Sequence, residues 1–517
     1  MLNLSVLLED SARRYPDKTA YIFGDATYTF SQINAMANKV ANGLKKLGLR
    51  RGDKVALSCI NQPYFPIIYN GILKAGCSVV PLSVLLKKDE IAYQLSNSDA
   101  KTYFCFVGTA DLPMLREGHA GFKEAPTCEH LIIITETLTT ESPIQGIKTF
   151  GTFIQDEADT FATAQTKPDD TAVIIYTSGT TGRPKGAELS HANLLMNAMS
   201  CVSLFKIVHE DVFITVLPMF HIFAMTVKMN AALYMGITNV LIPRFDALTV
   251  IRAIEKNRVT VFAGVPTMYW GLLNSKSDDL NIESAMKSLR IGVSGGASLP
   301  VQVLYDFEKR FDIPIYEGYG MSEGSPVVTF NHFGRTRKPG SVGTAIWGLE
   351  VKIADEKGKQ LPAGEKGELL YRGHNVMKGY YKNKEATRDT IKNGWLHSGD
   401  IAVMDEDGYF FIVDRTKDLI IRGGFNVYPR EVEEVIMQHP DVSMVAVIGI
   451  PNAQYGEEIK ACVVLKAGAT VSEQALIEFT KQLIASYKYP RHIQFMAALP
   501  LNASGKILKT ALRKSDN

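Results

Sequence analysis

The first 330 residues alternate short apolar runs with amphipathic stretches, and this alternation constrains the fold more than any other feature of the chain. The segment from Pro63 to Ala75 is predicted to be a helix between two such runs. Buried strands that alternate with helices are typical of α/β layers built on mostly parallel sheets. We therefore predict an α/β fold. The strand-length runs lie at 54–60, 78–83, 101–107, 130–135, 211–218, 239–244, 259–266 and 291–296.

The pattern changes twice further along the chain. After Gly340, short strands separated by Gly, Pro and charged turns indicate a β-rich subdomain. After Asp414, the stretch 430–440 has acidic residues in its first turn, as a helix start does, and strands follow at 442–450, 458–468 and 492–500. We predict a large layered α/β domain with a β-rich subdomain, residues 1–414, and a small α+β domain, residues 415–517.

Charge and cysteine usage restrict the partners and the compartment. Lys and Arg number 56 against 54 Asp and Glu, so the net charge of +2 gives no reason to expect a nucleic-acid partner. None of the six cysteines forms a C-x-x-C pair, which favours reduced thiols in a cytoplasmic protein over disulfides or zinc.

Membrane segments are not predicted. The first ten residues lack the basic region of a signal peptide, and no apolar run approaches the roughly 20 residues of a membrane span. We expect a monomer or homodimer that acts on small molecules, with peripheral membrane contact left open.

A hydroxyl-rich loop, YTSGTTGRPKG at 176–186, follows a predicted buried strand. Its glycines allow backbone N–H groups to turn toward a phosphate, its hydroxyls add donors and its lysine adds charge. The spacing is not that of a Walker A loop, so kinase and P-loop ATPase chemistry are not indicated. The residues predicted to bind phosphate are Thr177, Ser178, Gly179, Thr180, Thr181, Gly182 and Lys185.

This loop resembles the signature of the adenylate-forming superfamily, which includes acyl-CoA synthetases, peptide-synthetase adenylation domains and luciferases. The resemblance extends along nearly the whole chain and is greatest to bacterial long-chain fatty-acid–CoA ligases. It implies ATP, Mg²⁺ and CoA as ligands. The other matching motifs, in family order, are SGGASLP (294–300), EGYGMSE (317–323), GELLYRG (367–373), WLHSGD (395–400), DRTKDLI (414–420) and LNASGKI (501–507).

The first reaction that the resemblance implies joins a carboxylate to the α-phosphate of ATP. Two anions must meet, so cations and N–H donors have to offset their repulsion. By resemblance, Lys506 bridges the carboxylate and the α-phosphate, and Ser322 donates to that phosphate. Glu323 offers the oxygen ligand that Mg²⁺ prefers, with Thr177 near the metal.

The nucleoside contacts follow from the same motifs. Tyr319 offers a flat face for adenine, Asp400 accepts the ribose hydroxyls, and Arg415 adds a donor for ribose or phosphate. Close backbone approach to the base is predicted at Gly295, Gly296 and Ala297.

The second reaction replaces AMP with a thiol. In the superfamily the small domain rotates between the two steps, and Lys417 matches the hinge position, so the small domain is expected to be mobile. Gly423, Gly424 and Phe425 match the segment that then lines the thiol channel, although a larger or basic residue often occupies the position of Gly423. Because the chain ends soon after Lys506, we expect transfer to CoA. Transfer to a separate carrier protein, as in fatty-acyl-AMP ligases, is an alternative.

The acid pocket is predicted around the stretch LPMFHIFAM at 217–225. Peptide-synthetase domains place an Asp here to hold an amino group, and its absence counts against an amino-acid substrate. His221 is predicted to gate the pocket or to order the acyl group. Gly320 stands where acetate-specific relatives carry Trp, which is expected to leave room for a larger acid. The predicted lining is Phe220, His221, Ile222, Phe223, Val265, Pro266, Gly320, Pro326 and Val327.

The leading hypothesis is a ligase that converts a medium- or long-chain fatty acid, ATP and CoA into acyl-CoA, AMP and pyrophosphate. A 4-coumarate-like aromatic-acid ligase is the nearest rival. An inactive nucleotide- or acyl-binding protein is a third reading. The intact Lys506, Glu323, Asp400 and phosphate loop argue against it.

Overall fold

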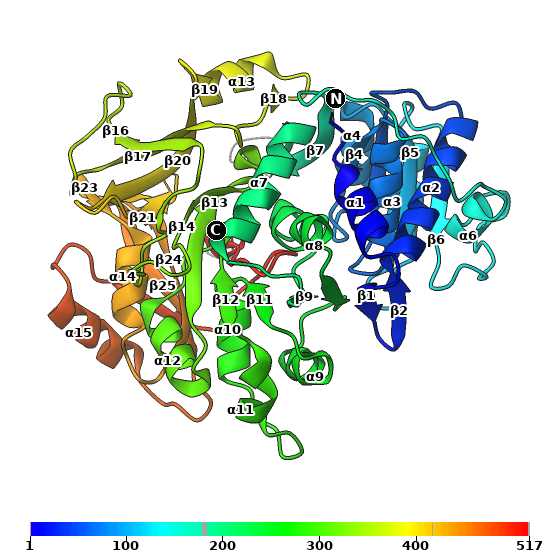
Figure 1. The fold of residues 1–517 in the computed structure, drawn as a ribbon. Coiled ribbons are helices and arrows are strands. Elements are labelled where there is room, and N and C mark those ends of the chain that lie inside the picture. Colours follow the sequence, from blue (N-terminus) through cyan, green and yellow to red (C-terminus); the bar gives the residue numbers. More distant parts are fainter. Residues whose placement is uncertain (1, 178–182, 416, 515–517) are drawn as a thin grey trace.

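The structure is a computed structural model that describes residues 2–177, 183–415 and 417–514. A seven-stranded sheet forms one layer of the large domain (Figure 1). Its strands are β3 (Lys54–Ser58), β4 (Ser78–Pro81), β5 (Ala100–Phe106), β6 (His130–Ile134), β7 (Thr171–Thr177), β8 (Lys185–Ser190) and β18 (Gly379–Tyr380), in the order β18-β8-β7-β4-β3-β5-β6. The strands from β7 to β6 are parallel, whereas β8 and β18 add antiparallel pairs at one edge.

A nine-stranded sheet forms the second layer. Its strands are β1 (Thr19–Phe23), β2 (Ala26–Thr29), β9 (Val212–Thr215), β10 (Thr238–Leu241), β11 (Val261–Gly264), β12 (Ile291–Ser294), β13 (Ile315–Gly320), β14 (Val327–Phe330) and β15 (Thr344–Ala345). Their order is β15-β14-β13-β12-β11-β9-β10-β1-β2, and the central pairs are parallel. The two mostly parallel sheets confirm the predicted fold class.

Helices cover and separate these sheets. The helix predicted at 63–75 is α3 (Tyr64–Lys74), and all of its residues are buried, as an all-round apolar helix requires. The other helices of the large domain are α1 (Val6–Arg14), α2 (Phe30–Lys46), α4 (Lys88–Asn97), α5 (Met114–Lys123), α6 (Phe150–Ile154), α7 (His191–Leu204), the π-helix η1 (Ala224–Asn230), α8 (Ala231–Met235), α9 (Ala247–Asn257), α10 (Pro266–Leu273), α11 (Ile282–Ala285), α12 (Val301–Phe311) and α13 (Lys384–Thr390), with 3-10 turns η2 (Met286–Ser288) and η3 (Ser322–Gly324).

The β-rich part after Gly340 is an antiparallel sheet. Its strands are β16 (Leu349–Ala354), β17 (Lys366–Gly373), β19 (Ile391–Lys392), β20 (Trp395–Met404) and β21 (Phe410–Arg415).

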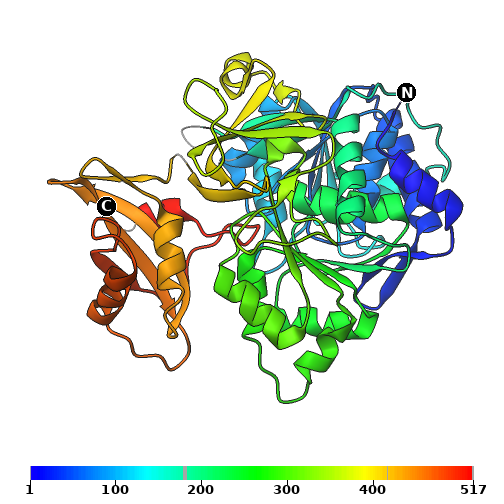
Figure 2. The same ribbon diagram turned by 60° about the vertical axis from the view of Figure 1, so that its left-hand side comes forward.

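A small unit follows. It contains β22 (Ile420–Arg422), β23 (Phe425–Val427), α14 (Pro429–Ile436), β24 (Val442–Asn452), β25 (Gly456–Leu465), α15 (Glu473–Leu483), β26 (His492–Phe495) and α16 (Lys509–Lys514). Figure 2 shows this small unit beside the large domain, with a late segment of the chain reaching from it toward the large domain.

Several strands end earlier than their apolar runs predict. The run at 211–218 forms a strand only to Thr215, and the run at 259–266 only to Gly264. The remaining residues leave the ladder and form loops at the carboxyl ends of parallel strands, the edge where α/β sheets hold their ligands. The run at 492–500 is a strand only to Phe495.

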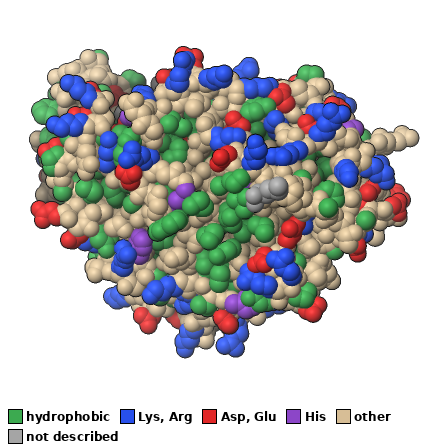
Figure 3. Space-filling model, turned by 45° about the horizontal axis from the view of Figure 1, so that its top comes forward, with side chains coloured by type: hydrophobic (Ala, Val, Ile, Leu, Met, Phe, Trp, Pro, Cys, Tyr) green, Lys and Arg blue, Asp and Glu red, His purple; other side chains and the backbone are tan. Residues whose placement is uncertain are grey.

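No helix in the described ranges combines the length and the hydrophobicity that crossing a membrane would need. Figure 3 shows hydrophobic side chains gathered in the middle of one face, with Lys and Arg side chains around them.

Candidate active site

A cavity of about 1630 Å³ opens between the carboxyl edge of the nine-stranded sheet, the antiparallel sheet and the small unit. Most of the predicted site residues meet there, although they come from segments more than 300 residues apart. Those that line the cavity are Thr177, Lys185, Phe220, His221, Ile222, Phe223, Pro266, Gly295, Gly296, Ala297, Tyr319, Gly320, Ser322, Glu323, Pro326, Val327, Asp400, Arg415, Lys417 and Lys506.

The phosphate loop joins two neighbouring antiparallel strands. Thr177 ends β7, Lys185 begins β8, and the two residues pair across the ladder. A Walker A loop leads from a strand into a helix, so this connection differs from it in topology as well as in spacing. The predicted residues Ser178, Gly179, Thr180, Thr181 and Gly182 lie outside the described residues.

Lys506 reaches the cavity on a tight turn that Asn502 organises. The Asn502 side-chain oxygen accepts the backbone N–H groups of Ser504 and Lys506, both at 3.0 Å. The Thr267 hydroxyl of the large domain donates to the carbonyl of Gly505 at 2.9 Å. A Cβ at Gly296 would lie 2.9 Å from Cε of Lys506, so a glycine there makes room for the lysine. Burial, with the Arg415 charge adding to it, lowers the pKa of Lys506 to about 8.

Asp400 is a buried carboxylate held by two partners. The Tyr319 hydroxyl donates to its Oδ2 at 2.5 Å, and Nε of Arg415 lies 3.4 Å from its Oδ1. Burial raises the pKa of Asp400, while the charge of Arg415 and the hydrogen bond from Tyr319 oppose that rise. The pairing of β20 with β21 sets Asp400 opposite Arg415.

Glu323 lies in η3 and is also buried. The Tyr380 hydroxyl donates to its Oε1 at 2.7 Å, and Nζ of Lys185 lies 5.1 Å from the centre of the Tyr380 ring. Sequence reasoning did not assign Tyr380 to the site, because nothing in its local sequence shows that its hydroxyl faces Glu323. It reaches the site because β18 pairs with β8.

His221 is half-buried and neutral over the physiological range. Burial, with the charge of Lys506 adding to it, lowers the pKa of His221 to about 3. The backbone N–H of Phe223 donates to its Nδ1 at 3.3 Å, so the proton of the neutral ring is on Nε2.

One predicted pocket residue does not line the cavity. Val265 is buried beneath Gly296 and Gly505 and does not border the cavity, because the strand-to-helix turn points its side chain into the core. Gly423, Gly424 and Phe425, predicted for the thiol channel of the second reaction, lie in the small unit outside this cavity, and the centre of the exposed Phe425 ring lies 4.7 Å from that of Tyr487.

A glycine is needed at position 320 for a reason other than the predicted one. A Cβ at this position would collide with the carbonyl oxygen of Pro326 in the adjoining segment. The glycine is therefore required by the close approach of the two backbones, and a tryptophan there would disturb the backbone before it filled the pocket.

The cavity extends beyond the motif residues into the core between α7, η1 and the nine-stranded sheet. The rings of Phe205 and Phe330 lie 4.7 Å apart in this branch. Of its lining, sequence reasoning predicted Val327 and missed the rest, because buried apolar residues carry no signal that separates a pocket from a core. The branch residues are Phe205, Val227, Val293, Val327 and Phe330.

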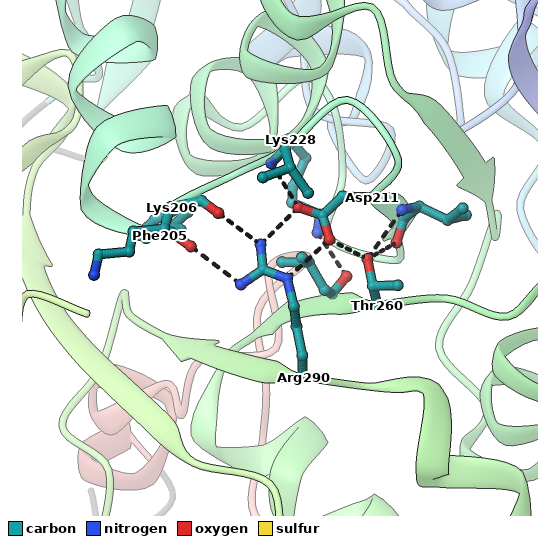
Figure 4. Close-up of polar contacts among 9 residues, drawn as sticks. Phe205, Lys206, Asp211, Lys228, Thr260 and Arg290 are labelled. Carbon is teal, nitrogen blue, oxygen red and sulfur yellow. Dashed lines mark hydrogen bonds and ion pairs between the residues drawn. The ribbon is translucent and has the colours of Figure 1, made fainter. Parts of the chain in front are cut away.

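A buried polar cluster lies next to this branch (Figure 4). Lys228, the neighbour of Val227 in η1, donates to the carbonyl of Val261 at 3.1 Å. Arg290 forms a two-bond fork with Asp211 at 2.9 and 2.6 Å, and the Thr260 hydroxyl donates to the same carboxylate at 2.7 Å. Burial lowers the pKa of Lys228 well below its ordinary value, which the charge of Asp211 opposes.

Comparison with known proteins agrees with this geometry. Residues 8–381 match the family described as AMP-binding enzyme, and residues 431–506 match the AMP-binding enzyme C-terminal domain. A long-chain-fatty-acid–CoA ligase of Bacillus subtilis (strain 168) is 36% identical, with 99% of this chain and 94% of the relative covered. A feruloyl-CoA synthase of Amycolatopsis sp is 34% identical, with 97% of each covered.

A solved structure has the same fold over nearly its whole length. The anthranilate CoA ligase AuaEII, in complex with anthranoyl-AMP, superposes with a TM-score of 0.91 at 31% identity, covering 99% of this chain and 97% of that one. The fold and the site define an AMP-forming acyl- or aryl-CoA ligase. The chain belongs to the AMP-binding enzyme family.

Proposed function

We propose that this enzyme activates a medium- or long-chain fatty acid as its acyl-adenylate and transfers the acyl group to the thiol of CoA. The apolar branch behind His221 carries the choice of acid. It is lined by Phe205, Val227, Val293, Val327 and Phe330 and offers a flexible hydrocarbon chain burial from water. The relative from Bacillus subtilis, named as a long-chain-fatty-acid–CoA ligase, supports the same assignment.

In the proposed adenylation step, Lys506 holds the acid carboxylate against the α-phosphate. Its Nζ offers three donors and a charge at the point where two anions meet. Ser322 donates to the phosphate, and His221 orients the acid through the proton on Nε2. The small residues at 295–297 (Gly295, Gly296 and Ala297) let the backbone approach adenine, and Tyr319 stacks on the base while it holds Asp400 toward the ribose.

Mg²⁺ fits the donors at the phosphate end. No group of three or more His, Cys, Asp or Glu in the part of the chain that is described could hold a metal ion. A cation that keeps several waters and binds through one carboxylate plus substrate phosphates needs no such cage. We propose Glu323 as its carboxylate, with Thr177 nearby. Once bound, Mg²⁺ would neutralise charge on the phosphates.

For the second step we propose that residues 415–517 move as one domain about Lys417. The two glycines of the 423–425 segment would then leave space for the pantetheine arm of CoA. Arg415 and Lys417 both line the cavity now, which supports a boundary at this point of the chain. The six cysteines, all buried and none of them in a disulfide, support a cytoplasmic location.

Acid-dependent pyrophosphate release over a panel of C2–C18 and aromatic acids, with and without CoA, tests the proposal. We expect the highest kcat/KM among C8–C18 chains and acyl-CoA as the product. Preference for an aromatic acid would overturn the fatty-acid assignment in favour of the chemistry named for the feruloyl-CoA synthase. Acyl-AMP that accumulates even with CoA present would favour a carrier-protein acceptor.

Val227 provides a matched test of the branch. Val227→Phe should shorten the preferred chain by several carbons, because the added ring would occupy the branch. Met199→Phe, at an exposed position of α7 outside the cavity lining, is the control. An unchanged chain-length profile for Val227→Phe would show that the acid lies elsewhere.

A further inference from the structure

Polar contacts at the starts of two helices join the large domain and the small unit. Asp414, at the end of the large domain, accepts the backbone N–H of Arg430 in the first turn of α14 at 3.0 Å. The Glu434 carboxylate faces the first turn of α12: burial raises its pKa, and the charge of Arg430 and the backbone N–H of Val301, the first residue of α12, oppose that rise. Pro300, at the N-cap of α12, provides no side-chain cap. Amides at a helix start lack intrahelical partners and carry partial positive charge, so a carboxylate stabilises them.

Arg430 adds contacts from the same turn of α14. Its guanidinium donates to the carbonyl of Ile412 and, at 3.4 Å, to the carbonyl of Gly340, both in the large domain. Its Nε lies 3.7 Å from Oε1 of Glu434. The two side chains therefore form one polar bridge from the small unit to the large domain.

A buried carboxylate lies within range of this bridge. Glu317 on β13 is 2% exposed, and its Oε1 accepts the backbone N–H of Leu299 at 2.9 Å. Its Oε2 has no hydrogen-bond partner among the described residues. Burial raises the pKa of Glu317 to about 7, and the positive charge of Arg430 opposes that rise and favours the ionised form. Removing Arg430 would leave a buried charge less compensated, which is costly.

Apolar packing completes the contact. Met437, just after α14, packs against the hydrophobic cluster that α9, α10 and α12 share in the large domain. The same orientation of the small unit brings Gly505 to Thr267 and Lys506 to Gly296. The contacts made by α14 and the position of Lys506 in the cavity thus occur together in one arrangement of the small unit and the large domain.

We propose that Glu434 and Arg430 are positioning residues that hold the small unit where Lys506 reaches the adenylation site. This inference rests on the proposed role of Lys506. It predicts an asymmetry between the two half-reactions: breaking the bridge weakens adenylation and spares thiol transfer, because the transfer step requires the small unit to leave this arrangement.

Glu434→Ala and Glu434→Gln test the inference. We expect acid-dependent pyrophosphate release to fall about three- to tenfold in Glu434→Ala, in keeping with the loss of a helix cap. The fall should be smaller in Glu434→Gln, which keeps the size of the side chain and an acceptor oxygen at the start of α12. Transfer from supplied acyl-AMP to CoA should stay at the wild-type rate or rise. Lys506→Ala is the reference for lost adenylation, and Glu478→Gln, on the exposed face of α15, is the control.

The orientation of the small unit is measured separately by energy transfer between dyes. All six native cysteines are buried, so labels on Lys276→Cys and Lys481→Cys report the distance between the two parts. Glu434→Ala should change the transfer efficiency, and Glu478→Gln should not.

Three results would count against the inference. Equal losses in both half-reactions would indicate general damage to the fold. Unchanged energy transfer in Glu434→Ala, whether or not adenylation changes, would overturn the bridge. A changed orientation with normal adenylation would instead contradict the role of Lys506.

Discussion

The Tyr319 hydroxyl donates to Oδ2 of Asp400 across a distance of 2.5 Å, and it joins β13 of the nine-stranded sheet to β20 of the antiparallel sheet. Asp400 is only 6% exposed, so water offers its carboxylate few hydrogen bonds and the bond from Tyr319 fixes its orientation. Tyr319 therefore has two roles. Its ring presents a face to the cavity, and its hydroxyl orients the Asp400 carboxylate, which we assign to the ribose.

Tyr319→Phe should therefore weaken ATP use while keeping the aromatic face. A hydrogen bond to a charged group contributes about 1.5–3 kcal/mol, so we expect KM for ATP to rise by about tenfold or more. KM for the acid should change little. Because the bond opposes the raised pKa of Asp400, its loss should move the acidic limb of kcat/KM for ATP to higher pH. An unchanged KM for ATP would refute the ribose assignment.

The pH profile of adenylation should also have a basic limb that belongs to Lys506. Its pKa of about 8 lies below the ordinary lysine value, so the charged form prevails below pH 8 and is lost as the pH rises through it. We expect kcat/KM for pyrophosphate release to be level near pH 7 and to fall about tenfold per unit well above pH 8.

Two charged neighbours of Lys506 shift its pKa, and with it the basic limb, in opposite directions. The charge of Arg415 lowers the pKa of Lys506 and that of Asp400 raises it. Arg415→Gln should move the limb to higher pH, and Asp400→Asn should move it to lower pH. A limb that moves the same way in both variants, or in neither, would assign it to another group.

Much of this site is predictable from the sequence, for a physical reason. The motifs at 294–300 and 317–323 follow adjacent parallel strands, and such strands end at one edge of a sheet, so their loops must meet. The predictions fail where a contact depends on packing: the turn at Val265 aims its side chain into the core, and Gly320 is required by a backbone that no local pattern reveals. The contact of Arg430 with the carbonyl of Gly340 is likewise invisible, because it depends on how the small unit meets the large domain.

Tyr380 offers a test of the proposed metal ligand. Its hydroxyl donates to Glu323 at 2.7 Å, so Tyr380→Phe leaves the carboxylate present but without this partner. Loss of such an outer contact typically costs about 10–100-fold in metal affinity, and we expect the Mg²⁺ concentration for half-maximal pyrophosphate release to rise accordingly. Tyr381→Phe is the control, because the Tyr381 hydroxyl bonds to Asp99 instead. Equal Mg²⁺ requirements in both variants would remove Glu323 from the metal site.

The buried amine of Lys228 should lower the stability of the protein at neutral pH. Its side chain is 1% exposed, and its Nζ lies 3.9 Å from the centre of the Phe213 ring. Burial holds its pKa below the value of about 10.4 that it has in the unfolded chain. Between these two values the unfolded state binds a proton that the folded state does not, so the free energy of unfolding rises with pH and levels off above the unfolded value.

Lys228→Met keeps the length of the side chain and removes the titrating group. We expect this variant to lose that dependence on pH and to gain about 1–3 kcal/mol in the free energy of unfolding at pH 7, less about 1 kcal/mol for the bond to Val261. Urea unfolding between pH 6 and pH 10 measures both effects, with the exposed Lys276→Met as the control. A Lys228→Met variant that is instead destabilised by several kcal/mol at every pH would show that Lys228 is charged in the folded protein. The Asp211 carboxylate would then need that charge in addition to its Arg290 and Thr260 partners (Figure 4).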